Sequence, residues 1–298
     1  MAKYDAMGDK VQRRVPVAVW IMIIGLIIGT VGLVWCLNTD LKKYVKTESL
    51  DTVQTLDEVK DLELTFDAAT TNISRSSDDK IHVTIDNAPK DVYSFGKKDG
   101  KFYIKTNKFT SFIRWSGISH IPFLKDIYPQ AKIKVELPDT AFEKVKINNG
   151  GGDLTVSGIN CSELEIDNGV GELTISSCTA EKTDIDNGVG KISASDCSFG
   201  KTEMDNGVGE IDLDDCKLSD SELDNGVGEI NVKAEIKGDI DVDNGVGEIN
   251  IKLKGDAGDY KFKGDDEGVK IVGEKDPDDA KYKVYLDNGI GDIKVEFV

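Results

Sequence analysis

The hexapeptide Asp-Asn-Gly-Val-Gly-Glu at residues 205–210 decides the fold, because it recurs along the chain at a fixed interval. Successive copies start 19 residues apart, one of them with lysine in the last place: Asp167, Asp186, Asp205, Asp224 and Asp243. A degenerate copy begins one period earlier at Asn148, and a late one begins at Asp287 after a step of 44 residues. Such a period predicts a repeat architecture in which each unit packs only against its neighbours.

Within each period, apolar residues alternate with polar ones, which is typical of β-strands. Ile211 and Leu213 follow one copy of the hexapeptide, and Thr202 and Met204 precede it. Nineteen residues hold two or three short strands with turns, but no helix and strand of ordinary length. The sequence therefore predicts an all-β fold, a β-solenoid or β-helix with 19-residue rungs, capped at both ends. Five rungs would stack to roughly 24 Å.

The repeated turn has a structural interpretation. Asn and Gly tolerate positive φ, so Asn-Gly makes a tight corner at little cost. Asparagines at one position of each rung would lie in register and hydrogen-bond from rung to rung as an amide ladder. These asparagines are Asn168, Asn187, Asn206, Asn225 and Asn244.

The same turn has a second interpretation as a cation contact. Asp167, Asp186, Asp205, Asp224 and Asp243 would form a column, and charges about 4.8 Å apart repel by roughly 1 kcal/mol in water. Bound Ca²⁺ could relieve that repulsion. The known glycine-rich calcium repeat has a different motif and period, and Lys191 interrupts the neighbouring glutamate column. We expect no cofactor and keep Ca²⁺ as the alternative.

Three cysteines, Cys178, Cys197 and Cys216, are also 19 residues apart, and Cys161 is two places out of register. They are expected to form a column of small buried side chains with free thiols. The spacing between rungs would also permit a disulfide. A metal-binding or reactive role is a further alternative, although the spacing is not that of a zinc site.

Charge limits the partners of the 298-residue chain, which has 55 acidic and 37 basic residues and a net charge of −18. From Asn148 onward the balance is 36 acids against 15 bases, a net −21, so the first 147 residues carry +3. An acidic surface repels phosphate backbones, so nucleic acid is not an expected partner and cationic ligands are. Only two histidines occur, which argues against His-based catalysis or a multi-His metal site.

Residues 15–37 carry no charge and are long enough to cross a bilayer as a helix. We interpret them as a single-pass transmembrane signal anchor, with a buried core helix as the alternative. Arg13 and Arg14 abut the span and the tail before it is short, which favours a cytoplasmic segment 1–14 and an extracellular C-terminal domain at the cell membrane. A cytoplasmic solenoid is the opposite possibility.

The rest of the chain divides into segments that differ in charge and in sequence pattern. Residues 38–61 are charged and are expected to form a juxtamembrane stalk, and residues 62–147 a β-rich N-terminal cap. Residues 148–252 are the regular solenoid, and residues 253–298 a C-terminal β cap. Caps are needed because the end rungs of a solenoid expose unpaired edges.

Residues 109–128 interrupt the N-terminal cap with a concentration of aromatic, apolar and basic side chains. One interpretation is a loop or helix packed over the end of the solenoid. The other is a contact surface for the membrane or a partner, because exposed aromatic and basic segments favour such interfaces. The candidate contact residues are Phe109, Phe112, Arg114, Trp115 and Phe123.

Three segments together resemble the bacterial "putative adhesin" family: residues 134–138 (KVELP), 145–150 (VKINNG) and 287–295 (DNGIGDIKV), with repeated Gly-acid-Leu/Ile units between them. The resemblance covers about residues 60–298. It implies a β-strand-repeat domain of largely unknown function, common in membrane-anchored Gram-positive proteins. Some relatives belong to Lia-type cell-envelope stress systems, which respond to membrane-active antibiotics and cationic peptides. The family supplies no catalytic residues.

The favoured function is therefore a non-catalytic, membrane-anchored cell-surface module that takes part in adhesion, envelope-stress sensing or binding of cationic ligands. A structural scaffold or partner-assembly element for another membrane protein is the first alternative. A carbohydrate-active β-helix enzyme is the second, since paired carboxylates are abundant. Against an enzyme, the acids follow the repeat instead of breaking it, and no arginine follows Arg114.

Overall fold

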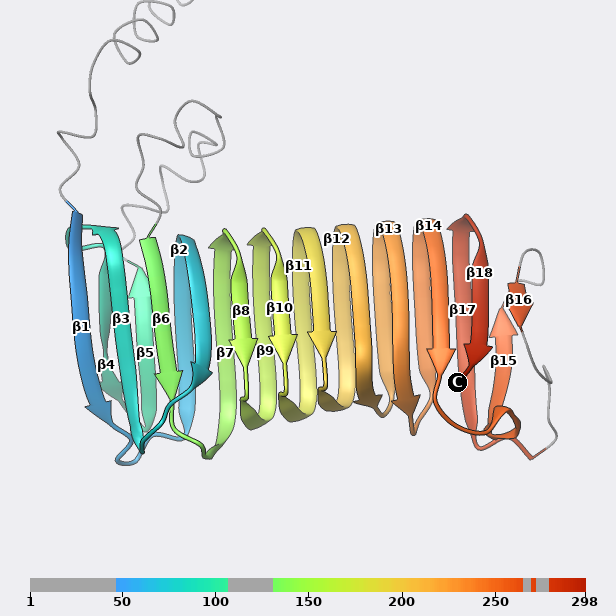
Figure 1. Ribbon diagram of the computed structural model, residues 1–298, viewed down its shortest axis with the longest axis horizontal. Coiled ribbons are helices and arrows are strands. Elements are labelled where there is room, and N and C mark those ends of the chain that lie inside the picture. The colour runs from blue at the N-terminus through green and yellow to red at the C-terminus, as the bar shows by residue number, and fades with distance from the viewer. Residues whose placement is uncertain (1–46, 107–130, 265–268, 272–278) are drawn as a thin grey trace, which may run out of the picture. The chain divides into compact units, whose positions relative to one another are not determined.

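A computed structural model describes residues 47–106, 131–264, 269–271 and 279–298. These residues form strands throughout, apart from turns and one three-residue 3₁₀ helix, and all the strands belong to one continuous hydrogen-bonded sheet. The sheet is wound into a stack of rungs (Figure 1). The predicted all-β class is confirmed. All described residues lie in one compact unit, Thr47–Val298.

The regular part of the stack pairs each strand in parallel with the equivalent strand of the next rung. Residues 19 positions apart face each other, as with Asp186 and Asp205, and with Asp205 and Asp224. The strands are β7 (Ala141–Gly151), β8 (Leu154–Ser157), β9 (Asn160–Val170), β10 (Leu173–Ser176), β11 (Thr179–Ser195), β12 (Ser198–Leu218), β13 (Ser221–Ile236) and β14 (Ile240–Leu253).

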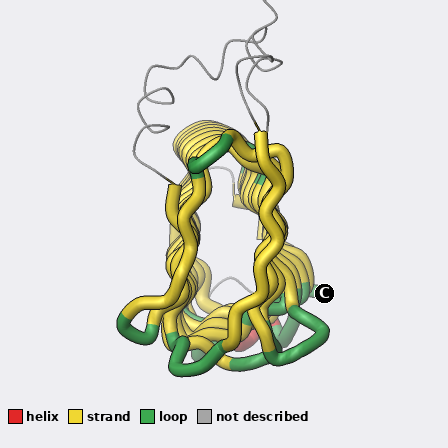
Figure 2. The backbone as a smooth tube through the Cα atoms, turned by 90° about the vertical axis from the view of Figure 1, so that its left-hand side faces the viewer, coloured by secondary structure: helices red, strands yellow, loops and turns green. Residues whose placement is uncertain are grey.

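The core lies between the walls of the wound sheet, which superimpose when viewed along the stack (Figure 2). Alternate residues point inward, as the sequence pattern predicts: Ile211 and Leu213 are buried, and so are Thr202 and Met204. Equivalent residues form continuous columns, and Ile192, Ile211 and Ile230 are one example. Burial of apolar side chains along these columns is the main stabilising term.

The N-terminal end changes from parallel to antiparallel pairing. β2 (Asp61–Arg75) is the first rung and pairs in parallel with β7 and β8. Beyond it, β1 with β3, β3 with β6, and β4 with β5 are antiparallel pairs. These strands are β1 (Thr47–Thr55), β3 (Lys80–Pro89), β4 (Tyr93–Lys98), β5 (Lys101–Thr106) and β6 (Ala131–Leu137).

The described part of the segment predicted as a stalk, residues 38–61, takes part in the sheet. Residues 47–55 form β1, which pairs with β3 so that Leu50 faces Ile85 and Val53 faces His82. Leu50 packs against the core, which gives this charged segment enough apolar contact to extend the sheet.

The C-terminal end explains the step of 44 residues. β14 pairs with β17 (Tyr282–Ile290) and β18 (Ile293–Phe297), so Val242 faces Leu286. The intervening chain forms a 3₁₀ helix (Ala257–Asp259), β15 (Tyr260–Gly264) and β16 (Val269–Ile271), which pair with the outer edges of β17 and β18. Tyr260 donates a hydrogen bond from its hydroxyl to the Ile236 carbonyl at 2.8 Å.

The predicted transmembrane segment 15–37 lies outside the described residues. Within the described ranges, no helix has the length and apolar character needed to cross a bilayer.

Candidate functional site

The hexapeptide repeats come together as one corner that runs the length of the stack. Inward positions shift from Met204 and Asn206 before the corner to Ile211 and Leu213 after it. Since inward residues along a straight strand are separated by even numbers, this shift from 206 to 211 marks the bend. The corner therefore separates two outer walls of the solenoid.

Inside the corner, the asparagines form the predicted amide ladder. Asn168 Nδ2 donates to Asn187 Oδ1 at 2.6 Å, and Asn187 to Asn206 at 2.6 Å. The ladder extends beyond the predicted residues, from Asn149 at one end to Asn288 at the other. The members from Asn149 to Asn244 are buried, so hydrogen bonding to their neighbours replaces the water they lose.

The last glycine of each hexapeptide is required by the close approach of neighbouring rungs. Gly209 has φ of +143°, and a Cβ placed on it would lie 1.7 Å from the carbonyl oxygen of Gly190. No side chain fits there, so stacking at this corner depends on glycine in successive rungs.

The aspartates of the hexapeptides form an outward-facing row along one side of the corner, in register from Asp167 to Asp243. Burial, together with the charges of Asp205, Glu222 and Asp243, raises the pKa of Asp224 to about 6. Burial and repulsion from Asp205 and Asp167 raise the pKa of Asp186 in the same way. The row thus holds like charges close enough to disfavour full ionisation.

A second row of carboxylates lies two residues upstream, on the same face of the sheet. Together the rows form what we call the acidic wall: Asp184, Asp186, Glu203, Asp205, Glu222, Asp224, Asp241 and Asp243. None of these eight side chains makes an ion pair with another described residue. Burial and the neighbouring Asp243 and Asp287 charges raise the pKa of Asp241.

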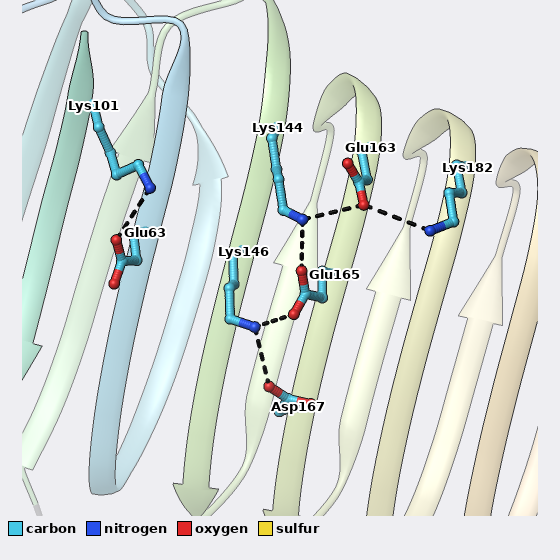
Figure 3. A network of polar contacts seen from close by, with 8 residues as sticks. All are labelled: Glu63, Lys101, Lys144, Lys146, Glu163, Glu165, Asp167 and Lys182. Atoms are coloured by element: carbon cyan, nitrogen blue, oxygen red, sulfur yellow. Dashed lines mark hydrogen bonds and ion pairs between the residues drawn. The ribbon is translucent and has the colours of Figure 1, made fainter. Parts of the chain in front are cut away.

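Figure 3 shows lysines paired with carboxylates of both rows at the N-terminal start of the rows, before the acidic wall. Lys144 pairs with Glu163 at 3.1 Å and with Glu165 at 2.7 Å. Lys146 pairs with Glu165 and reaches Asp167 at 3.7 Å. Burial opposes ionisation of Glu165, but hydrogen bonds from both lysines bring its pKa below the usual value.

The wall on the other side of the corner carries both basic and acidic side chains. Lys191, which interrupts the glutamate column, pairs with Glu210 at 3.2 Å and Asp212 at 2.9 Å. Lys233 pairs with Asp214 at 3.1 Å and Asp215 at 2.8 Å. Ion pairs therefore neutralise part of the negative charge on this wall, whereas none of the eight carboxylates of the acidic wall is paired with another described residue.

The tip of the corner is an exposed row of apolar side chains that the sequence interpretation did not anticipate. The fourth residue of each hexapeptide is 40–48% exposed in five successive rungs, and Ile290 is 68% exposed. We call this row the valine ridge: Val170, Val189, Val208, Val227, Val246 and Ile290. The signal was present, because valine or isoleucine occupies the same turn position in every copy from Asp167 onward.

The residues predicted to contact the membrane or a partner lie outside the described ranges: Phe109, Phe112, Arg114, Trp115 and Phe123. In the ranges that are described, no three His, Cys, Asp or Glu side chains converge in a way that could hold a metal ion. Cys161, Cys178, Cys197 and Cys216 are free and buried.

A parallel solenoid with an internal amide ladder and an acidic outer wall defines an extended β-repeat protein. The chain belongs to the Toastrack DUF4097 family, whose profile matches residues 59–268. This membership confirms the family resemblance found in the sequence. No curated protein matches the chain.

Three of the solved structures that are similar to the chain come from Bacteroides, Parabacteroides and Clostridium species. A putative adhesin from Bacteroides fragilis is 15% identical, with 85% of this chain and 98% of that chain covered and a TM-score of 0.47. A putative lipid binding protein from Parabacteroides distasonis is 16% identical, with 84% and 96% covered and a TM-score of 0.46. A putative cell adhesion protein from Clostridium sporogenes is 13% identical, with 85% and 100% covered and a TM-score of 0.37.

Proposed function

We propose that this chain is a non-catalytic cell-surface module, built of 19-residue rungs, whose acidic wall binds cationic ligands. The observation that carries the proposal is the set of eight wall carboxylates without an ion-pair partner among the described residues. Cationic peptides and positively charged cell-surface polymers are the ligands that this surface fits. Either would suit a role in adhesion or in sensing envelope stress.

The physical argument is relief of repulsion within the wall. Burial and neighbouring carboxylates raise the pKa of Asp224 to about 6, so an incoming cation would stabilise its ionised form. A polycation aligned with the stack would meet one pair of carboxylates at each rung, about every 4.8 Å. Such binding is long-range and weakens as salt screens the charges.

Ca²⁺, which takes carboxylate oxygens, is the alternative cationic ligand, although no three acidic side chains of the described residues converge on one point. A scaffold or partner-assembly role would use the same wall to dock a basic protein. We disfavour a carbohydrate-active enzyme, because the wall acids repeat in register from rung to rung and none of them departs from the pattern.

We further propose that residues 15–37 anchor the chain in the cell membrane as a single pass, with residues 1–14 inside and the solenoid outside. The uncharged length of the segment and the arginines before it support this orientation. Protease treatment of intact protoplasts should digest or release the solenoid, whereas a solenoid that is cut only after lysis would contradict the extracellular assignment.

Binding of fluorescent octalysine to the full-length chain in phosphatidylcholine nanodiscs tests the acidic wall, with empty nanodiscs as the blank. We expect binding at 20 mM salt that weakens at least about tenfold at 200 mM. The variant E203Q/D205N/E222Q/D224N should lose it. The control variant D79N/D99N/E181Q/D196N removes the same charge away from the wall and should retain binding. Equal binding by both variants would overturn the proposal.

A further inference from the structure

The valine ridge is the one extended apolar feature on the exposed surface of the described rungs. Isolated exposed valines, such as Val53, are ordinary in soluble proteins. The ridge differs because its members lie in register over successive rungs and form one continuous line. Contiguous exposed apolar surface of this kind marks an interaction site.

The turn itself does not require an apolar residue at the ridge position. The ladder asparagine and the glycine of close approach satisfy the corner, as Asn206 and Gly209 illustrate. Val208, between them in sequence, is 48% exposed. A polar residue there would cost the fold little, so the exposed valines indicate a surface that is covered by a partner.

Acidic side chains border the ridge on both sides. From Val208 to Ile290, an aspartate precedes each ridge residue by three positions and an acid follows it by two. The preceding row is Asp205, Asp224, Asp243 and Asp287, and the following row is Glu210, Glu229, Glu248 and Asp292. The surface is therefore an apolar line between two lines of negative charge.

We propose that the valine ridge and its bordering carboxylates bind an amphipathic helix that carries basic residues along both margins of its apolar face. This inference rests on the proposed binding of cationic ligands and specifies the class of partner. The helix would lie along the stack with its apolar face on the ridge and its Lys or Arg side chains over the two acidic rows.

The dimensions of the two surfaces match. Ridge residues repeat about every 4.8 Å, and helix residues three or four apart advance about 4.5–6 Å. Six ridge residues span about 24 Å, which corresponds to about 16 helical residues. A helix about 10 Å wide would bring basic side chains on both flanks within reach of the acidic rows.

Charge argues against two other candidates for covering the valine ridge, a second copy of this chain and an anionic membrane. A second copy of this chain, placed ridge to ridge, would bring four rows of carboxylates together, and an anionic membrane surface would repel both rows. Only a partner with positive charge on both sides of an apolar stripe satisfies the whole surface.

The test compares three fluorescent 18-residue peptides on the full-length chain in phosphatidylcholine nanodiscs, with empty nanodiscs as the blank. The first is a Lys/Leu peptide with its leucines on one helical face. The second has the same composition scrambled to disperse the leucines, and the third is octalysine extended with glycines to the same length. At 150 mM salt we expect the amphipathic peptide to bind at least about tenfold more tightly than the scrambled one.

The variant V208T/V227T/V246T keeps β-branched shape and charge while making the ridge polar. It should bind the amphipathic peptide about tenfold more weakly and octalysine unchanged, whereas the control V53T should behave as wild type. Far-UV circular dichroism and thermal melting verify that both variants fold. If octalysine does not bind the wild-type chain, the proposed function of the acidic wall is itself overturned. Octalysine binding with no preference for the amphipathic peptide, or with no effect of the valine substitutions, would overturn only the ridge.

Discussion

Asn187 and Asn206 are 19 residues apart in sequence, yet Asn187 Nδ2 donates a hydrogen bond to Asn206 Oδ1 at 2.6 Å inside the corner of the solenoid. Asn206 in turn donates to Asn225 at 2.9 Å, so each amide is both donor and acceptor. Because a displaced rung would leave buried amide groups without partners, the ladder fixes the register of the stack as well as stabilising it.

Replacing Asn206 with alanine should therefore destabilise the chain by about 2–4 kcal/mol, because it leaves the Asn187 donor and the Asn225 acceptor unpaired in a buried site. Urea unfolding followed by circular dichroism measures the change. Asn250 supplies the matched control: it donates to Asn231 at 3.1 Å but lies on the half-buried outer wall. Its alanine variant should lose less than about 1 kcal/mol, and equal losses would argue against the importance of burial.

Gly209→Ala should have a more severe effect. The added methyl group would lie 1.7 Å from the Gly190 carbonyl oxygen, and the φ of +143° is one that alanine rarely adopts. We expect a loss above about 3 kcal/mol, or failure to accumulate as soluble protein. Gly258→Ala is the control, since its Cβ would meet nothing nearer than 3.4 Å. A Gly209 variant that melts within a few degrees of wild type would show that the rungs can separate locally.

The acidic wall should make the solenoid less stable at pH 7 than at pH 5. The pKa of Asp224 in the folded chain is about 6, above its ordinary value near 3.8. The folded state therefore binds a proton more tightly than the unfolded state, and the stability this gives is lost as pH rises through 6. Asp186 and Asp241, whose pKa values are also raised, act in the same direction. In thermal melting from pH 4 to pH 8, the contribution of the wall to stability should fall between about pH 4 and pH 6 and change little above pH 7.

Asp224→Asn isolates this effect. It should raise the free energy of unfolding at pH 7 by about 1 kcal/mol, and by less at pH 5, because the wild-type carboxyl is then largely protonated. Asp215→Asn is the opposite control: Lys233 and Lys254 hold the pKa of Asp215 down to about 2. Removing the Asp215 carboxylate should slightly lower the free energy of unfolding at pH 7. If both variants shifted stability in the same direction, repulsion within the wall would not explain the pH dependence.

Sequence reasoning identified the regular rungs because an exact period fixes which residues face each other. Asn206 and Asp205 could be placed in a ladder and a row before any coordinates existed, since a 19-residue step repeats both. The antiparallel N-terminal end has no such period, so the role of residues 47–55 as β1 depended on long-range pairing with β3. The lysines that neutralise the start of the wall, Lys144 and Lys146, precede the first clear repeat and were missed for the same reason.

The valine ridge was missed for a different reason. An apolar residue in a strand-like pattern is assumed to be buried, and only the bend at the corner turns Val208 outward. Its position between two glycines was the available clue, because glycines on both sides mark a chain reversal.

The thiols of the cysteine column should be unreactive in the folded chain. Cys178, Cys197 and Cys216 are 1–2% exposed. A hydrogen bond with Cys178, and burial with it, raises the pKa of Cys197 to about 12, whereas the hydrogen bond with Cys197 lowers the pKa of Cys178. Burial, which keeps reagents away from all three thiols, is therefore the main barrier to their reaction. We expect all three thiols to resist N-ethylmaleimide for hours at pH 7 and to react within minutes in guanidinium chloride.

Peptide mass spectrometry of the labelled full-length chain reports each cysteine separately, and the unfolded sample confirms that every site can be modified. Isotopically distinct labels added before and after unfolding also reveal any thiol already joined to another, because a disulfide would take neither label without reduction. Rapid native labelling of Cys197 would mean that the rungs around it open far more often than its burial implies. A Cys178–Cys197 disulfide would instead show that the in-register column can be oxidised in the folded stack.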